Sequence, residues 1–143
     1  MKILLLGGTR FLGRHLAEQA LQAGHELTLL HRGRSGPALF RQARHLIADR
    51  NESLAVLDGD NSWDVAIDTN AYVPRHVRQL AREIAGRVGR YHLISTISVY
   101  DDLSAPGTTE SAPCATLADP AVEEVTGATY GGLKALCEGE CAK

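Results

Sequence analysis

A glycine-punctuated turn near the N-terminus constrains the fold of this chain more than any other feature. An apolar run, I-L-L-L at positions 3–6, precedes the turn, and a segment with a helical apolar period, Arg14 to Ala23, follows it. A strand, a tight loop and a helix in this order bring backbone N–H groups and the positive end of the helix dipole to one place. The sequence therefore predicts a site for a pyrophosphate, although a purely structural turn fits the same pattern. The turn consists of Gly7, Gly8, Thr9, Arg10, Phe11, Leu12 and Gly13.

The composition bounds the class of protein. At 143 residues, with 44% hydrophobic and 22% charged residues, the chain has the size and make-up of one globular domain. A net charge of −2 provides no electrostatic argument for nucleic acid or an anionic membrane, so we expect neither as a partner. No apolar run approaches the roughly 18 residues of a membrane span, and three cysteines make no disulfide framework. We therefore expect a cytoplasmic protein.

Strands and helices alternate along the chain. Short apolar runs predict strands at 3–6, Glu26–His31, His45–Ala48, Trp63–Asp68 and Tyr91–Ser95. The last of these runs is mostly apolar, which predicts a strand buried on both faces. Helical periods predict helices at 14–23, 38–42, 54–57, 74–85 and from residue 130 onward. This alternation predicts an α/β fold, namely a Rossmann-type doubly wound parallel sheet with helices on both faces.

Polar residues gather at the carboxyl ends of the predicted strands. In a doubly wound sheet, ligands bind beyond these ends, near the switch in strand order. The glycine loop follows the first strand, and five further polar or charged residues follow the other strands: Arg32, Asp49, Thr69, Asn70 and Thr96. The segment 101–129 shows no period and is rich in Ser, Thr, Pro and acidic residues, which predicts a long loop of the active site.

A tyrosine and a lysine lie four residues apart in the segment Y-G-G-L-K, at Tyr130 and Lys134. On a helix this spacing places the phenol and the ammonium group on one face, within mutual reach. A cation nearby favours the phenolate and lowers the tyrosine pKa from about 10, which makes the pair a candidate general acid/base. The alternative is a solvated tyrosine beside a surface lysine.

These three motifs, taken in order, resemble the extended short-chain dehydrogenase/reductase superfamily. The motifs are the glycine loop, the segment I-S-T-I-S-V-Y at 94–100, and the pair at Tyr130 and Lys134. The loop G-G-T-R-F-L-G and the phrase H-R-G-R-S at 31–35 are similar to a subgroup of NAD-dependent epimerases/dehydratases or reductase-like proteins. That subgroup is also similar to chloroplast stem-loop RNA-binding proteins. The resemblance covers nearly the whole chain.

The resemblance implies roles for individual residues. It implies that Tyr130 is the catalytic acid/base, that Lys134 lowers its pKa and binds the nicotinamide ribose, and that Thr96 hydrogen-bonds the substrate oxygen. The glycine loop, from Gly7 and Thr9 to Gly13, would hold the pyrophosphate through backbone groups of Arg10, Phe11 and Leu12. Asp49 would lie beside the adenine, and Thr69 and Asn70 would line the path of the cofactor.

The charge after the second strand bears on the choice of cofactor. An NAD site carries a carboxylate there for the ribose 2′-hydroxyl, whereas this chain has Arg32, which suits a 2′-phosphate. Arg10, which replaces the middle glycine of the usual loop, and Arg34 could close on the same group. We therefore expect NADP(H) to be preferred, with NAD(H) as the alternative; merely solvated arginines would remove the preference.

The resemblance also implies a length and an activity. Members of the superfamily continue into a substrate-binding part roughly as long again, whereas this chain ends nine residues after Lys134. We therefore expect residues 1–143 to be a dinucleotide-binding domain, truncated before the substrate-binding part and inactive alone. The expected function is an NADP(H)-dependent oxidoreductase or epimerase/dehydratase that acts on a small molecule, with a sugar nucleotide as an analogy. The alternative is a non-catalytic dinucleotide-binding or RNA-binding module. An exposed sheet edge suggests a homodimer.

The remaining candidates are assigned to packing. The six histidines show no metal-ligand spacing, so we expect no metal site. Cys137 and Cys141 share a helical face with Tyr130 and are expected to be small buried groups. Trp63 and Phe11 are likewise expected to be packing groups and not a stacking platform.

Overall fold

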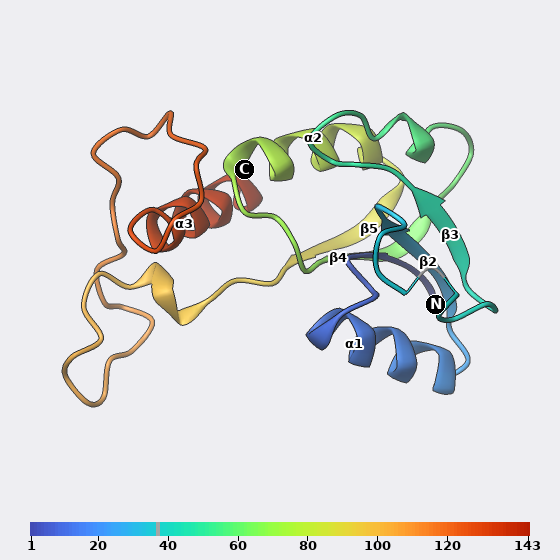
Figure 1. Cartoon of the computed structure of the whole chain (residues 1–143), viewed down its shortest axis with the longest axis horizontal. Helices are drawn as coiled ribbons and strands as arrows, with labels where there is room; N and C mark the ends of the chain where they lie inside the picture. The colour runs from blue at the N-terminus through green and yellow to red at the C-terminus, as the bar shows by residue number, and fades with distance from the viewer. Residues whose placement is uncertain (37) are drawn as a thin grey trace. The chain divides into compact units, whose positions relative to one another are not determined.

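Two compact units make up the chain in a computed structural model that describes residues 1–36 and 38–143 (Figure 1). Unit one comprises Met1–Asn70 and Gln79–Ile94, and unit two comprises Ala71–Arg78 and Ser95–Lys143. The strands are β1 (Lys2–Leu6), β2 (Glu26–His31), β3 (Arg44–Ile47), β4 (Trp63–Asp68) and β5 (Val88–Leu93). The helices are α1 (Phe11–Gln22), α2 (Pro74–Ile84) and α3 (Tyr130–Cys141), and the 3-10 helices are η1 (Ala55–Leu57) and η2 (Ile97–Val99).

Unit one is built on one parallel sheet. Its five strands lie in the order β3-β2-β1-β4-β5, and every adjacent pair is parallel. The chain builds outward from β1 to β2 and β3, then returns to the other side of β1 with β4. The predicted Rossmann-type sheet is therefore confirmed, and its switch point lies at the carboxyl ends of β1 and β4, where the glycine loop and Thr69 follow.

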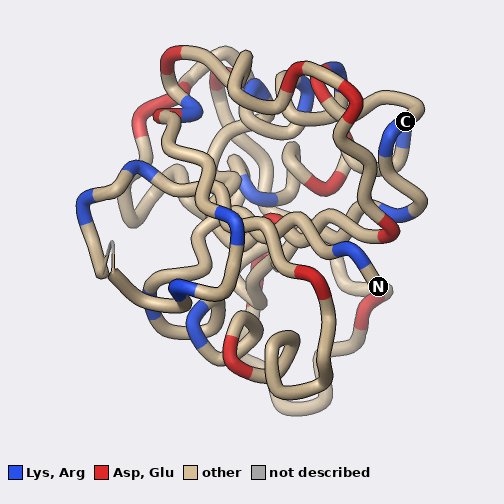
Figure 2. Tube along the Cα trace, turned by 90° about the vertical axis from the view of Figure 1, so that its right-hand side faces the viewer, with Lys and Arg blue, Asp and Glu red and all other residues tan. Residues whose placement is uncertain are grey.

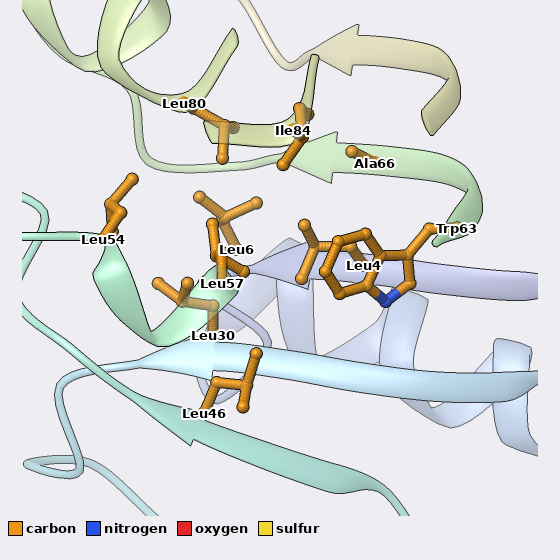
Figure 3. Packing of buried hydrophobic residues seen from close by; sticks show 10 residues of the cluster. All are labelled: Leu4, Leu6, Leu30, Leu46, Leu54, Leu57, Trp63, Ala66, Leu80 and Ile84. Atoms are coloured by element: carbon orange, nitrogen blue, oxygen red, sulfur yellow. The ribbon is translucent and has the colours of Figure 1, made fainter. Parts of the chain in front are cut away.

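Alternate side chains of β1 enter different apolar clusters, one on each face of the sheet. Leu4 and Leu6 pack with Leu80 and Ile84 of α2 and with Leu57 of η1, as Figure 3 shows. On the other face, the cluster contains residues of β1, β2 and α1, among them Ile3, Leu5, Leu29 and Ala17. Fully burying a leucine side chain stabilises a fold by about 1.5–3 kcal/mol, so the two clusters hold the sheet between its helices.

Trp63 is confirmed as a packing group of the interior. Its indole ring lies against Leu4 in the same cluster (Figure 3) and is 6% exposed. The indole N–H donates to the Thr28 hydroxyl at 3.2 Å, which satisfies the polar atom that burial would otherwise leave without a partner.

Two expectations for unit one are wrong in detail. The predicted helix at 38–42 is a series of turns, in which Phe40 adopts a φ of +57°. The fifth strand is Val88–Leu93 instead of Tyr91–Ser95, because the chain turns at Gly86 (φ +70°) and enters the sheet at once. It is the edge strand beside β4 in the described sheet, and Arg90 and His92, which alternate along one face, are exposed, so the strand is not buried on both faces.

Unit two contains α3 and the long irregular segment. Residues 101–129 form neither helix nor strand, which confirms their irregular structure; Tyr100 and Cys114 form an isolated bridge. Leu133 and Cys137 are the buried apolar residues of α3, whereas Cys141 is exposed. The expectation that both cysteines are buried is therefore right for Cys137 and wrong for Cys141, which lies in the last turn of the helix.

Charged residues of both signs are spread along the chain trace in Figure 2, in keeping with the net charge of −2. Across residues 1–36 and 38–143, no helix combines the length and the apolar character needed to cross a membrane.

Candidate functional site

The glycine loop joins β1 to α1 by a close approach of two backbone segments. Gly7 adopts a φ of +89°, and its N–H donates to the Leu30 carbonyl at 3.1 Å. A Cβ on Gly13 would lie 2.3 Å from the Gly7 carbonyl oxygen, so a side chain at this position would push α1 away from the strand. These glycines let the first turn of α1 lie directly beyond β1, which is the arrangement that the phosphate-loop prediction requires.

The first turn of α1 contains no group that neutralises its dipole. Arg10 is the N-cap residue, in an extended conformation and without a side-chain hydrogen bond to the helix, and the turn carries no acidic residue. Phe11 begins the helix with a φ of +40° and is 88% exposed. The expectation that Phe11 is a packing group is therefore wrong, because its side chain lies in solvent.

An acidic side chain and two arginines meet at the ends of β2 and β3. A guanidinium nitrogen of Arg32 lies 3.8 Å from the Asp49 carboxylate, and one of Arg34 lies 4.0 Å from it. Both arginine side chains are more than half exposed. A hydrogen bond from the backbone N–H of Asn51, at 3.0 Å, holds the pKa of Asp49 below its usual value, and Arg32 and Arg34 act in the same direction. The cluster therefore keeps one net positive charge.

A histidine pair supports the turn that carries these arginines. The Gly33 N–H donates to Nδ1 of His31 at 3.0 Å, so a neutral His31 carries its proton on Nε2. That nitrogen lies 2.8 Å from Nδ1 of His45, whose Nε2 in turn lies 3.1 Å from the Phe40 carbonyl oxygen. Burial and the neighbouring His45 lower the pKa of His31. Sequence reasoning missed this pair, because only the pairing of β2 with β3 brings the two residues together.

Thr69 and Asn70 follow β4 beside the glycine loop. The Thr69 hydroxyl donates to the Leu6 carbonyl at 2.7 Å. The backbone N–H of Asn70 donates to the Asp68 carboxylate at 3.1 Å, and the Asn70 side-chain oxygen accepts from Arg50 at 2.6 Å. Both residues are thus held at the switch point of the sheet, within unit one.

Arg50 is the residue of this edge that sequence reasoning missed. It lies in the connection after β3, yet it is buried and donates two hydrogen bonds to the carboxylate of Asp68, at 2.8 and 2.9 Å. The Tyr91 hydroxyl donates to the same carboxylate at 3.0 Å. One signal could have found it: Asp68 directly follows the apolar residues 65–67 of its strand, and a buried carboxylate requires a cationic or hydrogen-bonding partner.

In unit two, Tyr130 lines a cavity of about 520 Å³. The ring of Tyr130 lies 6.4 Å from that of Tyr72, centroid to centroid, and is half-buried. Lys134, one turn later on α3, is buried, and its ammonium group donates to the Ala71 carbonyl at 2.9 Å. The other polar residues lining the cavity are Ser98, Tyr100, Asp101, Thr116 and Thr126.

Thr96 is the N-cap residue of η2. Its hydroxyl oxygen accepts from the backbone N–H of Ser98 at 3.2 Å and lies 3.3 Å from the Ser98 hydroxyl. The residues that line the Tyr130 cavity include Ser98, but Thr96 is not one of them. A Cβ on Gly131 would lie 2.1 Å from the Ser98 carbonyl oxygen, so the start of α3 packs directly on η2.

The sequence is similar to two groups of proteins. Residues 3–64 match the NAD dependent epimerase/dehydratase family. The chloroplast stem-loop binding protein of 41 kDa b from Arabidopsis thaliana is 30% identical over 114 residues, an alignment that covers 69% of this chain and 30% of that protein.

The fold is that of solved sugar-nucleotide epimerases. A UDP-galactose 4-epimerase superposes with a TM-score of 0.79 at 20% identity, over 99% of this chain and 50% of that one. The UDP-glucuronic acid 4-epimerase from Bacillus cereus, solved in complex with NAD, superposes with a TM-score of 0.70 at 19% identity, over 99% of this chain and 52% of that one. The chain thus spans about half the length of these structures. Residues 3–64 thus match the NAD dependent epimerase/dehydratase family, and the chain has the fold of these solved epimerases.

Proposed function

We propose that unit one binds a nicotinamide dinucleotide with a preference for NADP(H), and that unit two supplies the acid/base chemistry of an oxidoreductase or epimerase/dehydratase. One observation carries the proposal. The same carboxyl edge of the sheet carries the N-terminus of α1, which has no side-chain cap and follows the glycine loop, and the cluster of Arg32, Arg34 and Asp49. A pyrophosphate suits the first feature, and an adenosine ribose or its 2′-phosphate suits the second.

In the proposal, different residues of unit one bind different groups of the cofactor. Backbone N–H groups from Arg10 to Leu12 would donate to the pyrophosphate, and Gly7, Thr9 and Gly13 would leave room for it. Arg32 and Arg34, with Arg10, would bind the 2′-phosphate, while Asp49 would lie beside the adenine. Thr69 and Asn70 would line the path toward the nicotinamide. The exposed guanidinium groups favour NADP(H), because a phosphate can make paired hydrogen bonds to them that a 2′-hydroxyl cannot.

Unit two would carry the proton. The dinucleotide, when bound, supplies or accepts a hydride. In the proposal Tyr130 exchanges a proton with a hydroxyl or carbonyl oxygen of the substrate, Lys134 favours the phenolate and binds the nicotinamide ribose, and Thr96 donates to the substrate oxygen. Hydroxyl groups dominate the polar lining of the Tyr130 cavity. We propose a small polyhydroxylated substrate, such as a sugar nucleotide, on which the similar 4-epimerases act by name.

Dinucleotide titration tests the cofactor assignment. We expect NADPH to bind this chain more tightly than NADH, and Arg32→Ala with Arg34→Ala to weaken NADPH by at least tenfold while NADH changes less. Arg41→Ala, which removes an exposed arginine outside the cluster, is the matched control. Tighter binding of NADH by the unaltered chain would refute the NADP(H) preference, and binding of neither would refute the proposal.

Substitution of the tyrosine tests the acid/base assignment. We expect Tyr130→Phe to bind NADPH as the unaltered chain does, and to lower turnover of the whole protein by about 10²- to 10⁴-fold. Equal turnover of the two forms would remove Tyr130 from the mechanism.

A second candidate is an RNA-binding module without turnover. The observation that favours it is the 30% identity to a protein named for stem-loop binding. A short RNA hairpin replaces the dinucleotide in the same titration. RNA binding that weakens steeply with salt and with Arg32→Ala, together with no dinucleotide binding, would favour this candidate.

A further inference from the structure

The orientation of the Asn70 amide is determined by Arg50. A guanidinium group only donates hydrogen bonds, so the Asn70 atom that lies 2.6 Å from Nη1 of Arg50 is the amide oxygen. The backbone N–H of Asn70 donates to Asp68, which anchors the residue at a second point. The side chain therefore has one orientation, with its nitrogen turned away from Arg50.

That nitrogen is directed toward the glycine loop. A Cβ built on Gly7 would lie 3.4 Å from Nδ2 of Asn70, so this amide group borders the loop at the end of β1. Among the residues that the structure describes, none accepts a hydrogen bond from this nitrogen. The amide thus presents two N–H donors at the switch point of the sheet, where a ligand rich in oxygen acceptors is proposed to bind.

At position 50, an arginine side chain can hydrogen-bond Asp68 and orient Asn70 at the same time. Its Nη1 donates both to Asp68 and to Asn70, and its Nη2 donates to the other oxygen of Asp68. A lysine could neutralise Asp68, but its single ammonium group lacks the planar fork that reaches three oxygens in fixed directions. The charge on Asp68 and the orientation of Asn70 can therefore be separated by substitution.

We propose that Arg50, held by Asp68, is a positioning residue that orients Asn70 so that its amide nitrogen donates to an oxygen of the bound dinucleotide. The inference rests on the proposed cofactor function and adds to it a residue that lies behind the ligand site. Arg50 acts through Asn70 and makes no contact with the cofactor itself.

A double-mutant cycle in NADPH affinity tests this coupling. Asn70→Ala removes the donor and should weaken binding about three- to tenfold, the usual range for one hydrogen bond. Arg50→Lys should weaken binding to a similar extent in the unaltered chain, and should have no further effect when Asn70→Ala is already present. Circular dichroism and urea unfolding of each variant report folding separately. Asn61→Ala is the control, because it alters a partly exposed amide that precedes β4, at the opposite end of that strand from Asn70.

Asn70→Asp provides a second test that leaves Arg50 in place. A carboxylate at position 70 still accepts from Arg50, but it has no N–H to offer the ligand. We expect this variant to fold and to lose at least tenfold in NADPH affinity.

The outcomes separate the two proposals. If the unaltered chain binds neither NADPH nor NADH, the proposed function and this inference both fail. If it binds a dinucleotide but Arg50→Lys weakens binding equally in both backgrounds, or Asn70→Asp binds as well as the unaltered chain, this inference alone is wrong.

Discussion

Replacing Asp68 with asparagine should destabilise unit one strongly, although the two side chains are nearly the same size. Asp68 is 0% exposed, and its carboxylate accepts two hydrogen bonds from the buried guanidinium of Arg50. Removing one partner of a buried ion pair costs about 3–5 kcal/mol, because the other charge remains buried without compensation. A domain of this size has a free energy of unfolding of about 5–15 kcal/mol, so the loss is a large fraction of it.

The assay uses the single tryptophan of the chain. Trp63 is buried in the apolar cluster of unit one, so its fluorescence reports the unfolding of that unit in urea. We expect the unfolding free energy to fall by about 3–5 kcal/mol, and the thermal midpoint to fall by about 10–20 °C. Glu18→Gln is the control, because it breaks the partly exposed Arg14–Glu18 pair of unit one, which should cost only about 0–1 kcal/mol.

An apolar replacement of the whole pair sharpens the test. Arg50→Met combined with Asp68→Leu removes both charges together, so we expect the double variant to be more stable than Asp68→Asn alone. It still loses the hydrogen bonds from Tyr91 and to Asn70, at about 0.5–1.5 kcal/mol each. If Asp68→Asn costs less than about 1 kcal/mol, or no more than Glu18→Gln does, the argument from a buried, uncompensated charge is refuted.

Two further predictions concern the arginine turn and the glycine loop. Folding lowers the pKa of His31 below its usual 6.5, so the His31 imidazole is protonated more readily in the unfolded chain than in the folded one. The contribution of His31 to the free energy of unfolding is therefore complete above about pH 6.5, and it is lost as the pH falls from there through the lowered pKa. In urea unfolding, His31→Asn should flatten this pH dependence. The control variant His15→Asn, at an exposed histidine, should leave it unchanged. Gly13→Ala places a Cβ 2.3 Å from the Gly7 carbonyl, so NADPH binding should fall at least tenfold, and unchanged affinity would contradict the close-approach argument; Gly139→Ala, in open space on α3, is its control.

Much of the fold could be predicted because it depends on local patterns. The apolar runs at 26–31 and 63–68 became β2 and β4 with the predicted bounds, and the period after Pro74 became α2. A central strand of this sheet buries both of its faces and a helix buries one apolar stripe, so the spacing of apolar residues in the sequence indicates the type of element. Two predictions failed where the environment was decisive. Residues 38–42 have a short helical period but lie in a connection, and β5 begins directly after a turn whose position depends on Gly86.

The candidate site was predictable only in part. The residues expected at the carboxyl edge of unit one do lie at the ends of their strands, because a parallel sheet brings all such ends to one edge. The roles assigned to them, and to Tyr130, Lys134 and Thr96, remain predictions. Phe11 was misassigned because an aromatic residue type does not show whether its side chain meets the core, and here the ring is exposed at the start of α1.

The sequence by itself determined the strand-loop-helix start, the alternation that produces a Rossmann-type sheet, and the residue types at the strand ends. These properties follow from side-chain period and from turn chemistry, which act over a few residues. Only the tertiary structure decided that Arg50 donates hydrogen bonds to both Asp68 and Asn70. It likewise decided that His31 contacts His45, and that Arg32 and Arg34 both lie near Asp49. Each of these contacts joins residues that are 14 or more positions apart in the sequence, and the order of the strands in the sheet brings them together.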